Sequence, residues 1–228
     1  MIKSLILLLM LASLQTLAQQ SVIKLNSGWQ AKKASDLTVD GTVISGTGFQ
    51  FYDWMDAVVP GTVLTTLLHN QKIPDPFFGM NNEQIPDISQ VGRDYYTYWF
   101  FNSFQIPEVK SGEQVWLKFR GINYTAEIFL NGKKINPDTH EGMFLREKYQ
   151  ITPFLQKGEN RLAVLVYPPD PAGAPNGQGG DGMIARSVAM QFTAGWDWIC
   201  PIRDRNTGIW DEVSVETTGP VDLLDPHV

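Results

Sequence analysis

The chain of 228 residues has only one cysteine, Cys200, and only three histidines, at positions 69, 140 and 227. A single cysteine excludes an intrachain disulfide, and we expect Cys200 to be a small buried apolar side chain. The histidines lie far apart and match no zinc spacing, so the sequence predicts no metal and no cofactor. The chain also has no Gly-x-Ser-x-Gly elbow and no phosphate-binding loop, which excludes two common kinds of catalytic site.

Positive charge and long apolar runs are scarce as well. The chain carries 18 Lys and Arg against 24 Asp and Glu, a net charge of −6 without a basic patch, which argues against nucleic acid as a partner. Lys3, the apolar run Leu5–Leu11 and the small-residue end Thr16-Leu17-Ala18 predict a secretory signal peptide over residues 1–18. The run is too short to span a bilayer, and no other stretch predicts a membrane segment. We expect an exported protein, periplasmic or extracellular, whose mature part is residues 19–228.

The mature part is dominated by alternation of apolar and polar residues with a period of two. Strands rich in aromatic and β-branched residues are predicted at Tyr95–Ile106, Gln114–Phe119, Tyr124–Leu130, Arg161–Tyr167 and Trp210–Glu216. Asn131-Gly132 predicts a tight hairpin turn, and Thr62 is the expected N-cap of a short helix at Val63–Leu68. Many strands with little helix predict an all-β fold, an antiparallel β-sandwich of jelly-roll type without an internal linker. We expect the following side chains to point into the core or a sheet interface, the two on Gln114–Phe119 depending on whether a bulge interrupts that strand: Trp116, Phe119, Ile128, Leu130, Leu162, Val164 and Val166.

One stretch, Pro168–Gly182, breaks this pattern because its prolines and glycines exclude both helix and regular strand. It is either a surface loop or a rim loop that orders against a ligand or a partner domain. Asp170 and Asp181 lack the ligand alternation of a calcium loop, so we predict no metal there.

The most informative motif is Trp196-Asp197-Trp198, in which a carboxylate stands between two indole rings. Aromatic rings stack on the C–H faces of a pyranose, and a carboxylate accepts hydrogen bonds from sugar hydroxyls, so the motif predicts a sugar site. In the alternative interpretation both tryptophans are core residues and Asp197 caps a turn. Seven tryptophans and seven tyrosines in an acidic exported chain also favour a carbohydrate partner.

No pair of catalytic carboxyl groups can be identified in the sequence. A glycosidase of the usual kind needs two carboxyl groups on opposite sides of the scissile bond. Glu83 lies in a loop rich in proline and asparagine, and nothing marks a partner for it, so we interpret it as a solvated surface residue. We therefore assign no catalytic residue to this chain.

Several passages together resemble the N-terminal sugar-binding domain of glycoside hydrolase family 2, in the branch of exo-β-D-glucosaminidases and β-mannosidases. They follow the family order over nearly all of the mature chain: Val59-Pro60-Gly61-Thr62, Ile73–Asn81, Tyr95–Phe101, Ala126–Gly132, Ile151–Leu155, Lys157-Gly158-Glu159-Asn160 and Trp196–Val213. Trp-Asp-Trp followed by Asp-Arg-Asn-x-Gly-Ile-Trp resembles the glucosaminidase branch more than plain β-mannosidases.

The resemblance implies a galactose-binding-like jelly roll over residues 19–228 that packs against an immunoglobulin-like domain and a catalytic (β/α)8 barrel. It implies that Asp197 hydrogen-bonds the sugar of the non-reducing-end subsite, that the aromatic ring of Trp198 flanks it, and that Asn81 approaches the same pocket; the motif itself adds Trp196 as the second ring beside Asp197. The polar run Arg203, Asp204, Arg205 and Asn206 matches the family motif more as site scaffold, and two roles stay open for it: a buried Asp–Arg network that fixes the loop, or direct contact with the ligand.

Two functions remain open at this point. In the first, the chain is the carbohydrate-binding domain of an exported β-glycosidase, supplies one wall of a sugar subsite and is inactive without its barrel, whose catalytic glutamates it lacks. In the second, it is a free-standing carbohydrate-binding module. Both predict a β-linked oligosaccharide as ligand and no nucleic-acid partner.

Overall fold

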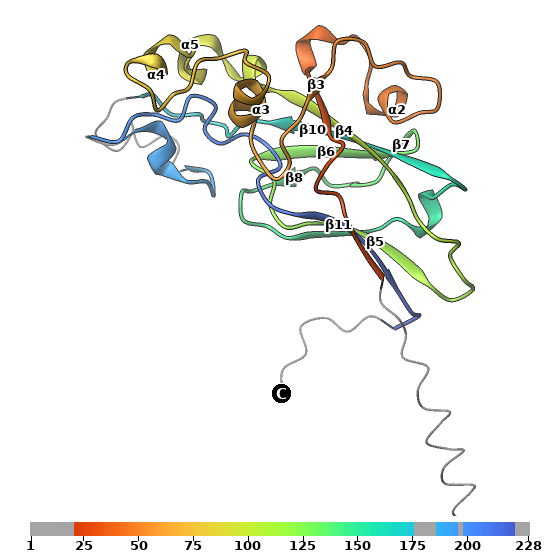
Figure 1. The fold of residues 1–228 in the computed structure, drawn as a ribbon. Coiled ribbons are helices and arrows are strands. Elements are labelled where there is room, and N and C mark those ends of the chain that lie inside the picture. Colours follow the sequence, from red (N-terminus) through yellow and green to blue (C-terminus); the bar gives the residue numbers. More distant parts are fainter. Residues whose placement is uncertain (1–20, 176–185, 196–197, 222–228) are drawn as a thin grey trace, which may run out of the picture.

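Two antiparallel sheets form the framework of the computed structural model, which describes residues 21–175, 186–195 and 198–221 (Figure 1). One sheet is four-stranded, with the order β1-β11-β5-β9, and the other is seven-stranded, with the order β3-β2-β4-β10-β6-β7 and with β8 paired to β6. The predicted all-β sandwich is confirmed. The predicted signal peptide, 1–18, lies outside the described residues.

The strands have the following bounds: β1 Ser21–Lys24, β2 Gln30–Lys33, β3 Met55–Asp56, β4 Tyr98–Gln105, β5 Gln114–Phe119, β6 Thr125–Leu130, β7 Lys133–Lys134, β8 His140–Glu141, β9 Glu147–Gln150, β10 Glu159–Tyr167 and β11 Val213–Thr218. The helices are short: α2 Gly41–Ile44, α3 Val63–His69, α4 Asn81–Gln84 and α5 Ile88–Val91, with 3-10 turns at Ala34–Asp36, Arg93–Tyr96, Thr152–Phe154 and Gln191–Ala194. The five predicted strands correspond to β4, β5, β6, β10 and β11.

Local sequence signals account for the predicted turn and helix. Thr62 caps α3: its hydroxyl accepts from the Thr65 amide at 3.2 Å, and the Thr65 hydroxyl accepts from the Thr62 amide at 2.7 Å. Asn131 and Gly132 both adopt positive φ, 51° and 80°, in the turn between β6 and β7. The Thr62 cap and the Asn131-Gly132 turn were both predicted from residue type alone, and both predictions are confirmed.

The main core lies between the two sheets and contains six of the seven predicted core residues: Phe119, Ile128, Leu130, Leu162, Val164 and Val166. The seventh prediction, Trp116, is wrong. Strict alternation on β5 turns Val115, Leu117 and Phe119 inwards and places Trp116 on the other face. There its ring lies 4.3 Å from the Lys148 amine, and its Nε1–H donates to the Thr218 hydroxyl at 3.1 Å.

A second apolar cluster covers the outer face of the seven-stranded sheet. The segment that contains α2 crosses this face (Figure 1), and Ile44 packs there with Trp99, Phe101 and Leu165. The same segment adds Phe49, Phe51 and Trp54 in edge-to-face contacts. The sheet is therefore buried on both faces, which explains the nearly continuous apolar run of β10.

The expectation of a buried Cys200 is also wrong, since its side chain is exposed in the segment that follows Trp198.

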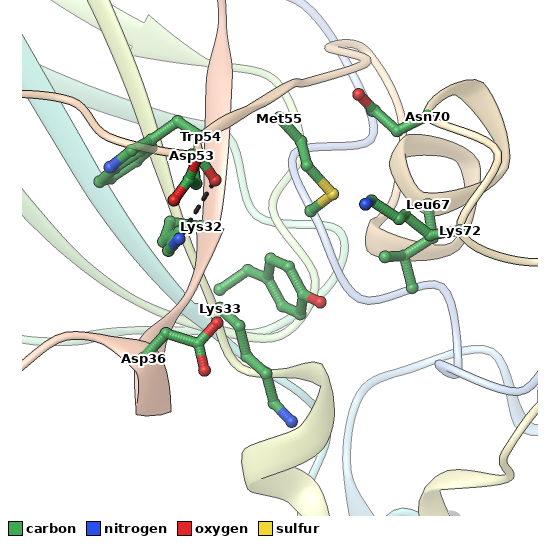
Figure 2. A pocket seen from close by; sticks show the side chains of 10 residues that line it. Lys32, Lys33, Asp36, Asp53, Trp54, Met55, Leu67, Asn70 and Lys72 are labelled. Atoms are coloured by element: carbon green, nitrogen blue, oxygen red, sulfur yellow. Dashed lines mark hydrogen bonds between the residues drawn. The ribbon is translucent and has the colours of Figure 1, made fainter.

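None of the helices in the described parts of the chain has the length and apolarity that a bilayer crossing requires. A cavity of about 620 Å³ lies beside β3 and α3 (Figure 2).

Candidate functional site

Those predicted site residues that the structure describes lie at one end of the sandwich, where α4 and α5 lie beside the segment that leads into β11 (Figure 1). Trp196 and Asp197 lie outside the described residues. Trp198 is described and is 82% exposed. The structure thus places one of the two predicted indole rings on the surface and excludes the core interpretation for Trp198.

Asn81 begins α4 and directs its side chain into its own loop. Its Nδ2 donates to the Asp75 carbonyl at 3.0 Å, and its Oδ1 accepts from Nε2 of the Gln84 side chain at 3.3 Å. The next residue, Asn82, donates from Nδ2 to the Pro201 carbonyl at 3.3 Å. These bonds place the α4 loop against the segment that follows Trp198, although the two are more than a hundred residues apart in the sequence.

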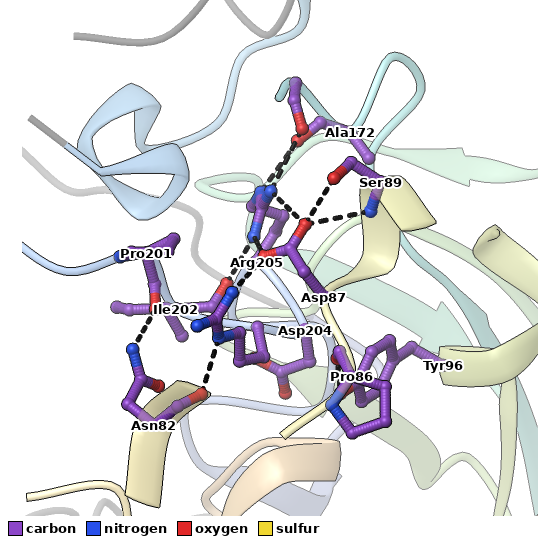
Figure 3. A network of polar contacts seen from close by, with 12 residues as sticks. Asn82, Pro86, Asp87, Ser89, Tyr96, Ala172, Pro201, Ile202, Asp204 and Arg205 are labelled. Atoms are coloured by element: carbon purple, nitrogen blue, oxygen red, sulfur yellow. Dashed lines mark hydrogen bonds and ion pairs between the residues drawn. The ribbon is translucent and has the colours of Figure 1, made fainter. Parts of the chain in front are cut away.

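A buried ion pair between Asp87 and Arg205 organises this end of the molecule (Figure 3). Arg205 Nη1 and Nη2 bind the two carboxylate oxygens of Asp87, both at 2.9 Å, and neither side chain is exposed. The Arg203 Nη1 lies 3.5 Å from the same carboxylate, and its Nε donates to the Asn82 carbonyl at 2.9 Å. Both arginines are held by the protein interior, so neither is arranged to reach a ligand.

The remaining N–H groups of Arg205 extend the network to two other loops. They donate to the carbonyls of Ile202 at 2.7 Å, Ala172 at 2.8 Å and Gly173 at 3.0 Å. Together with the two bonds to Asp87, these contacts use all five N–H donors of the guanidinium. The first part of the predicted loop 168–182 is therefore fixed to the site scaffold, and its remainder, 176–182, lies outside the described residues.

Asp87 remains ionised because of its partners. Burial disfavours its charge, but hydrogen bonds from Arg205 and Ser89 outweigh burial and hold the pKa of Asp87 below its ordinary value. Asp87 also caps α5, where Oδ1 accepts from the Ser89 amide at 2.9 Å and the Ser89 hydroxyl at 2.6 Å. Sequence reasoning missed Asp87; the signal available was a helix N-cap pattern, which does not reveal an arginine partner 118 positions away.

Asp204 is fully buried beside the N-terminal end of α3. Its Oδ2 accepts from the Leu64 amide at 2.8 Å and its Oδ1 from the Asn206 amide at 2.9 Å. Burial raises the pKa of Asp204 to about 6 because the hydrogen bonds to it offset only part of the desolvation. Arg205 and Asn206 adopt positive φ, 53° and 59°, and the Asn123 side chain donates to both of their carbonyls at 2.8 and 2.9 Å. The tight turn at 204–207 is thus fixed from several sides.

This end of the molecule exposes apolar side chains around the rigid network. Phe77 is 96% exposed, and Phe78, Met80 and Trp198 are also largely exposed. A cluster of large apolar residues at the surface is typical of an interface with another domain or a ligand. Asp87 and Asp204 are buried and already bonded, whereas Glu83 is exposed on α4, so these three carboxyl groups do not form a pair across a common cleft.

Within the described residues no group of three or more His, Cys, Asp or Glu side chains could hold a metal ion. This end of the molecule therefore combines the buried Asp87–Arg205 network, the exposed indole ring of Trp198 and an apolar rim, by which we mean the exposed side chains Phe77, Phe78 and Met80.

Comparisons with known proteins agree with this description. The mannosylglycoprotein endo-β-mannosidase of Lilium longiflorum is 51% identical over 215 residues, which are 90% of this chain and 22% of that protein. The exo-β-D-glucosaminidase of Streptomyces avermitilis is 28% identical over 205 residues, covering 89% of this chain and 20% of that protein. The chain thus spans about a fifth of the length of these curated relatives.

Solved structures show the same pattern. The crystal structure of the Amycolatopsis orientalis exo-chitosanase CsxA matches with a TM-score of 0.68 at 25% identity, over 87% of this chain and 21% of that one. The β-D-mannosidase of Dictyoglomus thermophilum matches with a TM-score of 0.65 at 28% identity, over 86% and 22% of the two chains. The family model described as glycosyl hydrolase 2 galactose-binding domain-like matches residues 29–211. The chain therefore belongs to glycoside hydrolase family 2, as its N-terminal galactose-binding-like domain.

Proposed function

We propose that this chain is the carbohydrate-binding N-terminal domain of an exported β-glycosidase and supplies one wall of the non-reducing-end sugar subsite. Asp197 hydrogen-bonds a sugar hydroxyl, Trp196 and Trp198 flank the ring, and Asn81 borders the pocket. The observation that carries the proposal is the buried Asp87–Arg205 ion pair, which fixes the segment directly after Trp198. A subsite wall needs such support because a sugar-binding group must be held in place before the sugar arrives.

The substrate class follows from the relatives. The 51% identity to an endo-β-mannosidase that acts on mannosylglycoproteins exceeds the 28% identity to an exo-β-D-glucosaminidase. We infer a β-mannoside within an oligosaccharide as the substrate of the complete enzyme. A β-glucosaminide is the second candidate, supported by the Trp-Asp-Trp and Asp-Arg-Asn-x-Gly-Ile-Trp motifs.

The exposed apolar rim supports a partner domain rather than an independent module. Phe77, Phe78 and Met80 protrude beside the candidate site, and burying them against a catalytic barrel would remove a large apolar surface from water. In this arrangement the barrel supplies both catalytic carboxyl groups and the chain supplies one side of the pocket. The signal-peptide pattern at residues 1–18 supports export of the enzyme.

A chimeric enzyme provides the test. Residues 21–221 of this chain replace the matching part of the lily enzyme, and kcat/KM is measured on a mannosylglycopeptide and on chromogenic β-mannosides and β-glucosaminides. We expect an active chimera that prefers β-mannosides and loses activity on Asp197→Ala. Asp138→Ala, at an exposed position after β7, is the matched control. An active chimera that Asp197→Ala leaves unchanged would contradict the proposed subsite.

A further inference from the structure

The segment that carries Trp198 is fixed to the domain at its base. The Ile202 amide donates to the carbonyl of Thr193 at 2.8 Å, and Thr193 is buried. In the sequence the exposed Trp198 stands between these two residues, so it belongs to a segment that starts and ends at the same point of the domain surface. The backbone geometry at this base therefore sets the direction from which the indole ring projects.

Gly195 allows the two sides of the base to approach each other closely. Its φ of 93° and ψ of 154° form a backbone conformation that residues with a Cβ rarely adopt. A Cβ at this position would lie 3.1 Å from the Ile199 carbonyl oxygen and 3.3 Å from the Pro201 nitrogen, both closer than ordinary van der Waals contact. Because these two neighbours are backbone atoms, no side-chain rotation relieves the contact. A larger residue at 195 would have to push the segment around Trp198 away from its present place.

Asn82 makes a second contact with the same base, from α4 (Figure 3). Its Nδ2 donates to the Pro201 carbonyl at 3.3 Å, and its own carbonyl accepts from the Arg203 Nε at 2.9 Å. Arg203 also lies 3.5 Å from the buried carboxylate of Asp87. Asn82 thus connects the residues on either side of Ile202 to the rigid network of the site scaffold.

We propose that Gly195 and Asn82 are positioning residues for the sugar-binding wall, because they fix the backbone from which the Trp198 ring projects. Neither residue touches the sugar in this arrangement, since Gly195 has no side chain and the Asn82 amide is directed at the Pro201 carbonyl. An aromatic ring that is oriented in advance avoids the cost of ordering it when the ligand binds. The role in sugar binding rests on the proposed function, whereas the positioning itself can be measured without a ligand.

NMR of the full chain with 15N-labelled tryptophan measures the positioning. Trp198→Phe identifies the backbone amide signal of Trp198 among those of the seven tryptophans. We expect the heteronuclear NOE of this amide to match that of Trp99 in β4. Gly195→Ala and Asn82→Ala should each lower the NOE of Trp198 and shift its signal, while the signals of Trp99 and Trp116 stay unchanged.

The chain offers a matched control for each variant. Gly92 ends α5 with φ 82° and ψ 165°, close to the conformation of Gly195, but among the described residues no atom lies within 4 Å of a Cβ at this position. Gly92→Ala therefore introduces similar backbone strain without the contact, and it should lower the Tm but leave the Trp198 signal unchanged. Asn70→Ala removes two side-chain hydrogen bonds to backbone carbonyls at the end of α3, and it is the control for Asn82→Ala.

A double-mutant cycle in the chimeric enzyme tests the connection to the sugar. We expect Gly195→Ala to lower kcat/KM for the preferred β-mannoside by roughly tenfold, through displacement of the wall, and Asn82→Ala by roughly threefold, through loss of one hydrogen bond. In the Trp198→Ala background both effects should fall below about twofold, because the ring through which the two residues act is gone. A purely structural role would lower kcat/KM of the folded enzyme equally in both backgrounds.

The outcomes separate this inference from the proposed function. An Asp197→Ala chimera with unchanged kcat/KM overturns the subsite and, with it, the role of this base in sugar binding. If Asp197→Ala does lower kcat/KM, the subsite stands, and the positioning role alone is overturned by any of three results: a Trp198 signal that neither variant changes, a signal that the two controls change equally, or effects on kcat/KM that persist in the Trp198→Ala background. Should Gly195→Ala fail to fold, Asn82→Ala decides the question, since Asn82 is only half-buried.

Discussion

Replacement of Asp87 by asparagine should destabilise this domain far more than an ordinary surface substitution. The new amide keeps the shape of the side chain and can still accept from the Ser89 amide, but it removes the negative charge that faces Arg205. The guanidinium is then left as an uncompensated charge at a position without solvent exposure. Breaking a buried pair in this way costs about 3–5 kcal/mol. For a domain of this size that corresponds to a decrease in Tm of roughly 6–20 °C.

The assay is urea unfolding followed by tryptophan fluorescence and far-UV circular dichroism, with Asp138→Asn as an exposed control. Asp87→Asn, Arg205→Met and the double variant form a thermodynamic cycle. We expect the double variant to be about 2 kcal/mol less destabilised than the sum of the two single variants, because each single change leaves a buried polar partner. The cost of Asp87→Asn should also shrink at acid pH, since the pKa of Asp87 is depressed in the folded state and its stabilisation is lost as the carboxylate becomes protonated. A cost below about 1 kcal/mol, equal to that of the control, would refute the reasoning.

Three further predictions concern activity and pH. Purified residues 19–228 should not hydrolyse β-glucosaminides, β-mannosides or β-galactosides, because they supply no facing pair of carboxyl groups; turnover that Glu83→Gln abolishes would contradict this. In a complete enzyme Asp197→Ala should lower kcat/KM by roughly tenfold to a thousandfold, since a charged hydrogen bond to a sugar is worth about 1.5–3 kcal/mol. The Tm should change little, and a collapse of the Tm with normal kcat/KM in the folded fraction would identify Asp197 as structural. The pKa of Asp204 is raised from 3.8 to about 6, so the folded state holds a proton that the unfolded state has released over this range. Stability relative to Asp204→Asn should therefore fall by about 2 kcal/mol between pH 4 and pH 6, and denaturation midpoints that stay parallel would refute this.

The features that sequence reasoning predicted are those encoded by neighbouring residues. Alternation identified β5, β6, β10 and β11, and local capping identified α3. The wrong assignment of Trp116 came from neglecting the alternation with Phe119, which places the two side chains on opposite faces.

The features it missed depend on contacts between distant segments. Cys200 was expected to be buried on composition alone, but its exposure depends on how the loops at this end pack. The pairing of Asp87 with Arg205 and the cavity around Tyr98 arise only when separate loops are brought together. The residue types of the run 203–206 predicted a polar network there, but they could not show that the carboxylate that pairs with Arg205 belongs to Asp87.

The long sequence separation of the Asp87–Arg205 pair has a consequence for biosynthesis. A ribosome releases the α3–α5 region well over a hundred residues before Arg205 and Asp204, so the helix ends of that region have no partners during most of translation. β1 likewise stays unpaired until β11 emerges, since the two strands are neighbours in the four-stranded sheet. The first hairpins of the other sheet, which join residues close in sequence, can form early, whereas the Asp87–Arg205 pair and the pairing of β1 with β11 must wait for the last part of the chain. Nascent chains that stall before residue 205 would therefore carry an assembled β-sheet beside open loops, and those loops are the segments that proteases and chaperones would encounter.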